Sequence, residues 1–165
     1  MATGSPVSVH EYLNASYRPD CDYVDGEVLE RNVGEKSHSR LQTALWLYYD
    51  ARRRQWGLWS FVELRVQISA TRFRIPDVCV TVGDPPEQVL TTPPFICVEV
   101  LSPEDRLSAI RERGDDYLAF GVPYVWIIDP IVRRAWRYTR EGMHEVVELR
   151  TQSPDTVVPL QDLFE

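Results

Sequence analysis

Short apolar runs separated by polar segments predict a series of strands along the chain. The runs are rich in aromatic and β-branched residues, which favour extended structure. They lie at 58–68, 72–82, 95–101 and 124–129, and a C-terminal hairpin is expected at 134–139 and 144–149. The runs at 95–101 and 124–129 are almost continuously apolar, which is typical of strands covered on both faces. Residues 22–30 add an extended segment with a turn at Asp25-Gly26.

Helical spacing of the apolar positions predicts three helices among these strands. Ser8 and Glu11 have the spacing of a capping box and open a short helix that runs towards Asn14. The last helix is expected from about Glu104 to Phe120, where Gly121 and Pro123 stop it.

The middle helix is expected to be the longest. Ser37 can cap its start, it runs to about Gln55, and Gly57 suits its end. Its apolar face is expected to carry Leu41, Leu45 and Tyr48. Helices that alternate with strands in this order predict an α/β fold with a mixed central sheet flanked by helices. The length of 165 residues favours one domain over 1–165.

The charge balance limits the kinds of partner the chain can bind. The formal net charge is -7, and a protein that binds nucleic acid without a metal needs cations for the phosphates. Arginines cluster at 52–54, at 72 and 74, and at 106–113. For each cluster alone, a solvated surface is the simpler interpretation. A metal-dependent nuclease can nevertheless be acidic overall, because divalent ions meet part of the phosphate charge.

The cysteines and the missing long apolar segments predict a cytoplasmic protein. Cys21, Cys79 and Cys97 include no CxxC pair, so we expect buried free thiols in a reducing compartment. No apolar run approaches the roughly 18 residues that cross a bilayer. The stretch from Met1 to Leu13 lacks the basic and apolar regions of a signal peptide.

Two carboxylates stand in otherwise apolar strands and are the first candidates for chemistry. Side-chain alternation puts Asp77 on the face of Cys79 and Glu99 on the face of Cys97. An unpaired buried carboxylate costs several kcal/mol, roughly, so a cation between the two would explain both. Hard oxygen ligands suit Mg²⁺ or Mn²⁺. A strand end in water, or pairing of either acid with an arginine, stays open as the alternative.

The last predicted helix offers a cation on its apolar stripe. Arg106, Ile110, Arg113 and Tyr117 recur at steps of four, three and four residues, so they share one face. Arg113 lies between two residues that are expected to cover the sheet, and it should therefore point towards the strand that carries Glu99. The alternative is a salt bridge on the helix surface.

Several motifs of the chain resemble a known family. They are R-I-P-D-V-C-V at 74–80, C-V-E-V-L-S-P-E-D-R at 97–106, and D-Y-L-A-F-G-V-P-Y-V-W-I-I-D-P at 116–130. The upstream D-Y-V-D-G-E-V and Ser-His-Ser segments fit as well. Together they resemble the Uma family of restriction endonucleases, which are bacterial domains of the PD-(D/E)xK nuclease superfamily. The resemblance extends from about Tyr12 to Phe164 and implies a restriction-endonuclease-like core.

The resemblance implies roles for particular residues. Asp77 and Glu99 look like the two metal ligands of the motif, helped by the carbonyl of Val100. Leu101 stands where the motif has its lysine. In Uma-like domains the cation comes instead from the following helix, four residues before its tyrosine, which here is Arg113.

Two further residues match acidic and histidine positions of the family. Glu27 lies in the Asp-Gly-Glu turn, and His38 opens the long helix. They are second-tier candidates for a second metal or for positioning a water molecule. For each of them, an ordinary surface residue remains the alternative.

The resulting hypothesis is an endonuclease that hydrolyses DNA with Mg²⁺ or Mn²⁺. Arginine effectively keeps its proton, so Arg113 could stabilise transition-state charge but could not act as a general base. A catalytically silent module that binds nucleic acid or protein is therefore the alternative, and a purely structural ion pairing of Asp77 and Glu99 is the third. The acidic surface and the apolar C-terminal strands would permit a homodimer.

Overall fold

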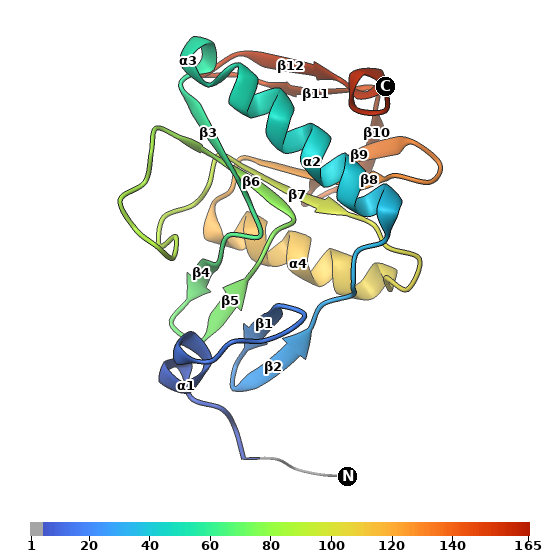
Figure 1. Ribbon diagram of the computed structural model, residues 1–165. Coiled ribbons are helices and arrows are strands. Elements are labelled where there is room, and N and C mark those ends of the chain that lie inside the picture. The colour runs from blue at the N-terminus through green and yellow to red at the C-terminus, as the bar shows by residue number, and fades with distance from the viewer. Residues whose placement is uncertain (1–4) are drawn as a thin grey trace.

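A six-stranded mixed sheet with a helix on each face forms the centre of the molecule (Figure 1). The computed structural model describes residues 5–165, so the first four residues of the N-terminal stretch considered above lie outside it. The sheet has the order β10-β9-β8-β7-β6-β3. Its strands are β3 (Leu58–Val62), β6 (Val78–Val82), β7 (Ile96–Val100), β8 (Tyr124–Asp129), β9 (Arg134–Thr139) and β10 (Gly142–Val146). Helix α2 (Lys36–Ala51) covers one face, and α4 (Leu107–Phe120) covers the other.

Only one neighbouring pair in this sheet is parallel, and α4 makes the crossover. Strands β7 and β8 run parallel, whereas the other pairs are antiparallel. A parallel pair needs such a connection because a tight turn cannot return the chain to the same end of the sheet. The predicted α/β architecture with a mixed central sheet is confirmed.

Smaller elements surround this centre. A four-stranded sheet of order β2-β1-β5-β4 lies at the end of the molecule near the N-terminus, together with α1 (Figure 1). These elements and those of the C-terminal part are α1 (Val9–Asn14), β1 (Cys21–Val24), β2 (Glu27–Glu30), α3 (Arg53–Trp56), β4 (Val66–Ser69), β5 (Arg72–Arg74), β11 (Glu148–Thr151), β12 (Thr156–Pro159) and a 3-10 helix (Leu160–Leu163). No helix among residues 5–165 is both long enough and apolar enough to cross a membrane.

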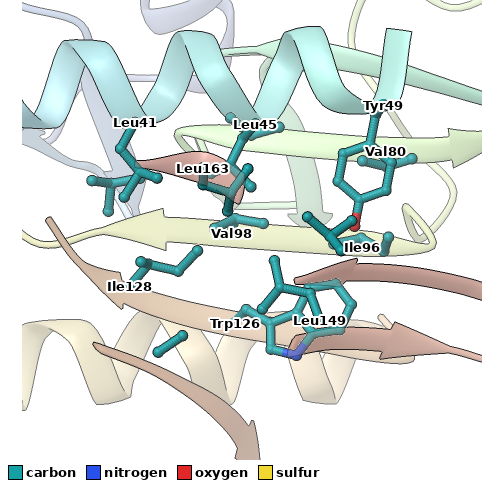
Figure 2. Close-up of a cluster of buried hydrophobic side chains, with 14 of the residues drawn as sticks. Leu41, Leu45, Tyr49, Val80, Ile96, Val98, Trp126, Ile128, Leu149 and Leu163 are labelled. Atoms are coloured by element: carbon teal, nitrogen blue, oxygen red, sulfur yellow. The ribbon is translucent and has the colours of Figure 1, made fainter. Parts of the chain in front are cut away.

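The larger apolar core lies between α2 and the central sheet. Figure 2 shows Leu41, Leu45 and Tyr49 pointing from α2 towards the strands. They meet Val98 and Trp126 of β7 and β8, which like them are almost fully buried. The three helix residues recur every four positions, so they form one stripe on the helix.

A second core lies on the opposite face, beneath α4. Ile110 and Tyr117 of α4 pack there with Cys79, Cys97 and Ile127. Cys79 and Cys97 are direct partners across β6 and β7, and with Cys21 they are free and buried, as predicted. The alternation predicted for the two strands is thus confirmed, because the cysteines and the opposed valines lie in different cores.

Some local predictions were wrong. The long helix begins at Lys36 after Glu35, which makes no side-chain cap, so Ser37 does not cap it. It ends at Ala51 rather than near Gln55, and the short α3 follows before Gly57. The predicted face is confirmed in part: Tyr48 is half-buried and packs against the same core as Leu41 and Leu45, but Tyr49 is the more deeply buried of the two tyrosines. The centroid of the Tyr48 ring also lies 3.6 Å from the Arg52 guanidinium carbon.

The two long apolar runs each break into two strands. Residues 58–68 break at Glu63, whose φ of 51° belongs to the left-handed region. Residues 72–82 break at Pro76, which has no N–H to donate to a sheet. The break before β6 matters for the site, because Asp77 then stands at a strand end instead of in mid-strand.

Gly114 permits the close approach of α4 to β9. A Cβ atom added at Gly114 would lie 2.6 Å from ring atoms of Tyr138. We expect Gly114→Ala to lower the free energy of unfolding by about 1–3 kcal/mol, because a packed ring must move. Chemical denaturation measures this. Ser108→Ala on the exposed side of the same helix is the control, and equal stability of the two variants would contradict the tight contact.

Candidate functional site

Asp77 and Glu99 face each other at the ends of two neighbouring antiparallel strands. The register pairs Cys79 with Cys97 and Val78 with Val98, and one further step brings Asp77 opposite Glu99. The Val100 N–H donates to Asp77 Oδ2 at 2.7 Å, which extends this pairing. Side chains directly opposite each other share one face of a sheet. Both residues are almost fully buried, with exposed fractions of 3% and 1%.

Arg31 and His38 surround the Asp77 carboxylate. Arg31 Nη2 donates to Asp77 Oδ1 at 2.5 Å, and His38 Nε2 lies 3.4 Å from the same oxygen. Burial alone would raise the pKa of Asp77, but the His38 hydrogen bond, the Arg31 charge and the Val100 N–H outweigh it and lower the pKa. Asp77 is therefore an ionised carboxylate.

Glu99 has a different environment, and its pKa moves the other way. Tyr117 Oη donates to Glu99 Oε1 at 2.5 Å, and Arg113 Nη1 donates to Oε2 at 3.2 Å. Burial raises the pKa of Glu99 to about 7, and the nearby Asp77 charge adds to the rise, while Arg113 opposes it. Two facing carboxylates cannot both ionise at low cost, so the pair divides into one ionised acid and one that retains its proton longer.

A second buried ion network holds this pair in place. Asp22 of β1 accepts from Arg74 Nη1 at 3.1 Å and from the Ile75 N–H at 3.1 Å. Arg113 Nε lies 3.3 Å from Asp22 Oδ2, and Arg74 Nε donates to Asp116 on α4 at 2.7 Å. The small sheet, α4 and the two acids are thereby linked through side chains that are mostly buried.

The comparisons with known proteins identify the family of the chain and a solved structure with its fold. The model of one family, described as "Putative restriction endonuclease" and called Uma2, matches residues 9–165. The chain belongs to the Uma2 family. A crystal structure of a "putative nuclease belonging to DUF820" from Anabaena variabilis has the same fold, with a TM-score of 0.80 and 19% sequence identity. The match covers 96% of this chain and 98% of that chain. No curated protein matches.

Most of the site residues predicted from sequence meet in this Uma2-family fold, and one does not. Asp77, Glu99, Arg113 and His38 lie together, and Arg113 points inward as its place on the helix stripe predicts. Glu27 is exposed in β2, the edge strand of the small sheet. Within residues 5–165 it forms no hydrogen bond or salt bridge with the cluster. The inward-pointing acid of this hairpin is Asp22, whereas Glu27 lies at the surface, as in the alternative interpretation of that residue.

Two residues of the cluster, Arg31 and Asp22, were missed in the sequence, and the role of a third, Tyr117, was recognised only in part. Arg31 follows β2 in a polar stretch without periodicity, so nothing local marks it as buried. Asp22 sits between the buried residues Cys21 and Tyr23, and this acid inside a strand was a signal that could have been used. Tyr117 was recognised as facing the sheet, but its hydroxyl was not assigned to Glu99.

The donor types suit a hard divalent ion, although the carboxylates are engaged. Asp77, Glu99 and the Val100 carbonyl are oxygen ligands of the kind that Mg²⁺ and Mn²⁺ prefer. Within residues 5–165 no group of three or more acidic, histidine or cysteine side chains is arranged to hold a metal. All four carboxylate oxygens of the pair accept hydrogen bonds from Arg31, Val100, Tyr117 and Arg113. These oxygens therefore suit a divalent ion, provided that an arginine side chain that donates to them moves away.

The titration of Glu99 should be visible in the metal-free protein. We expect its carboxyl to titrate near pH 7, because burial and Asp77 disfavour the charged form. The folded protein then binds this proton more tightly than the unfolded chain does. The stabilising contribution is complete below about pH 4.5 and is lost as the pH rises through about 7. Carboxyl ¹³C NMR, assigned with Glu99→Gln, measures the midpoint. An ordinary glutamate midpoint would show that Glu99 is hydrated.

Proposed function

We propose that the chain hydrolyses phosphodiester bonds of DNA with Mg²⁺ or Mn²⁺ held by Asp77 and Glu99. The observation that carries the proposal is the facing pair of buried carboxylates, Asp77 just before β6 and Glu99 on β7. Burying two acids side by side is costly without a cation. Two buried acids that face each other in the metal-free protein therefore form a site that a positively charged ligand would stabilise.

Each residue of the cluster has a separate task in this proposal. Asp77 and Glu99 would hold the ion, with the carbonyl of Val100 as a further ligand. When bound, a divalent ion there would lower the pKa of a water molecule and offset the charge of the scissile phosphate. Arg113 would donate to the phosphate oxygens as negative charge develops in the transition state. Tyr117 fixes the orientation of Glu99, and His38 lies close enough to Asp77 to orient it or a water molecule.

A catalytically silent module is the second candidate, and the arginines favour it. Lys36 is the only lysine of the chain, and it is exposed at the start of α2. The cations at the acids are Arg31 and Arg113, which effectively cannot give up a proton. Hydrolysis would therefore depend on the ion and on water without a lysine base, and a low rate is expected.

A nuclease assay with controlled metal content separates the two candidates. Supercoiled plasmid and single-stranded DNA are incubated with the protein in Mg²⁺, Mn²⁺, Ca²⁺ or EDTA. Cleavage in Mg²⁺ or Mn²⁺ that disappears in EDTA supports the enzyme, provided that Asp77→Ala protein purified in parallel is inactive. Metal binding without cleavage would support the silent module. Cleavage that Asp77→Ala leaves intact would reject Asp77 as a ligand.

A further inference from the structure

Arg31 is the only guanidinium that contacts Asp77 among the described residues, and its position is unusual for a surface loop. It follows directly after β2, and the next four residues are exposed. Its own side chain is only 9% exposed because it turns inward to Asp77. A buried arginine in an otherwise exposed stretch indicates that Asp77 requires a positive charge.

Charge balance limits what else can enter this cluster. Asp22, Asp77 and Glu99 face three arginines, Arg31, Arg74 and Arg113, so the charges balance when Glu99 is ionised. A divalent ion added to this arrangement would leave an excess of positive charge in a buried site. Release of Arg31 from the cluster would reduce this excess, so exchange of the ion for Arg31 costs less than addition of the ion.

The surroundings of Arg31 also make its release feasible. Its Nε is buried and has no hydrogen-bond partner within residues 5–165, so the interior does not satisfy the whole guanidinium. A surface pocket beside it is lined by Arg31, Gly34 and the carboxylate side chains of Glu30, Glu35 and Glu104. These three glutamates are exposed, so a guanidinium released from Asp77 would find carboxylate partners beside water in this pocket.

We propose that Arg31 supplies, in the metal-free protein, the positive charge that a divalent ion provides beside Asp77 when it binds. Ion binding then releases the Arg31 guanidinium into the neighbouring acidic pocket. This inference rests on the proposed ion site. It makes Arg31 a determinant of metal affinity. The wild-type protein then binds Mg²⁺ or Mn²⁺ more weakly than its two carboxylates alone would.

The first test compares Mn²⁺ affinity between Arg31→Met and wild type by isothermal titration calorimetry. We expect binding at least about tenfold tighter in the variant, because the competing cation is gone. Arg72→Met removes the same charge from an arginine whose salt bridges go to Asp25 and Asp116. Its affinity should stay within about twofold of wild type. Unchanged or weaker binding in Arg31→Met would overturn the inference.

A second measurement uses the wild-type protein and does not depend on the folding of a variant. Titration with Mg²⁺ should shift the arginine Nε–H NMR signal of Arg31 and leave that of Arg72 in place. A carboxyl signal of Asp77 that moves with Mg²⁺ while the Arg31 signal stays fixed would reject the exchange and keep the ion site. Absence of ion binding in both wild type and Arg31→Met would reject the ion site together with the inference. Binding in Arg31→Met alone would support the exchange and explain an inactive wild type.

Discussion

Asp77→Ala is expected to reduce metal-dependent DNA cleavage at least about a thousandfold. The variant loses the ionised carboxylate of the pair, and with it the ligand that anchors the ion. An ion contributes several kcal/mol of transition-state stabilisation, roughly, which corresponds to this factor in rate. Gel-based cleavage rates at saturating Mn²⁺ measure the effect.

A structural control is needed because Asp77→Ala also leaves Arg31 without its counter-charge. Asp116→Asn is suitable, since it weakens a buried ion pair with Arg74 and contacts neither acid of the site. We expect it to lower stability and to keep most of the cleavage rate. If Asp116→Asn lost activity as completely as Asp77→Ala, general loss of structure would explain both.

Arg113→Ala is expected to lower the free energy of unfolding of the metal-free protein by about 3–5 kcal/mol. Arg113 lies within 3.3 Å of both Asp22 and Glu99, and each of these acids is 1% exposed. Removal of one partner of a buried pair leaves an uncompensated charge, which costs this amount. Urea denaturation of the metal-free protein measures it, and Arg111→Ala, on the exposed side of the same helix, should change stability by less than about 0.5 kcal/mol.

Substitutions of Arg113 also test which cation the site needs for cleavage. Arg113→Ala should also lower any cleavage rate, whereas Arg113→Lys should keep or raise it, because lysine provides a proton-exchanging cation close to the acids. If Arg113→Ala changed neither stability nor cleavage, Arg113 would be excluded from the site and the silent module would become the better account.

Much of the fold follows from local patterns in the sequence. The apolar runs that became β7 and β8, the alternation around Cys79 and Cys97, and the Ser8–Glu11 capping box depend on neighbours in the chain, and they were predicted correctly. Element boundaries were predicted less well. The long helix ends at Ala51 because the backbone at Arg52 leaves the helical conformation, and the most buried residue at that end is Tyr49, next to the predicted Tyr48.

Only those residues of the site that stand out within a single strand or helix could be predicted from the sequence. Asp77, Glu99 and Arg113 each stand out against an apolar background within one strand or helix. Arg31 and Asp22 act through contacts that are 46 and 53 residues away in sequence, to Asp77 and to the Ile75 N–H. No local pattern reports such distant pairings, and the exposure of Glu27 follows from the position of β2 at the edge of its sheet.

The central claim is that Asp77 and Glu99 hold one divalent ion between them, and a crystal structure with Mn²⁺ tests it most directly. The account predicts an anomalous-difference peak within about 2.5 Å of oxygens from both carboxylates, with Arg31 turned away from Asp77. A well-ordered site in saturating Mn²⁺ that shows no such peak, with Arg31 still hydrogen-bonded to Asp77, would contradict it.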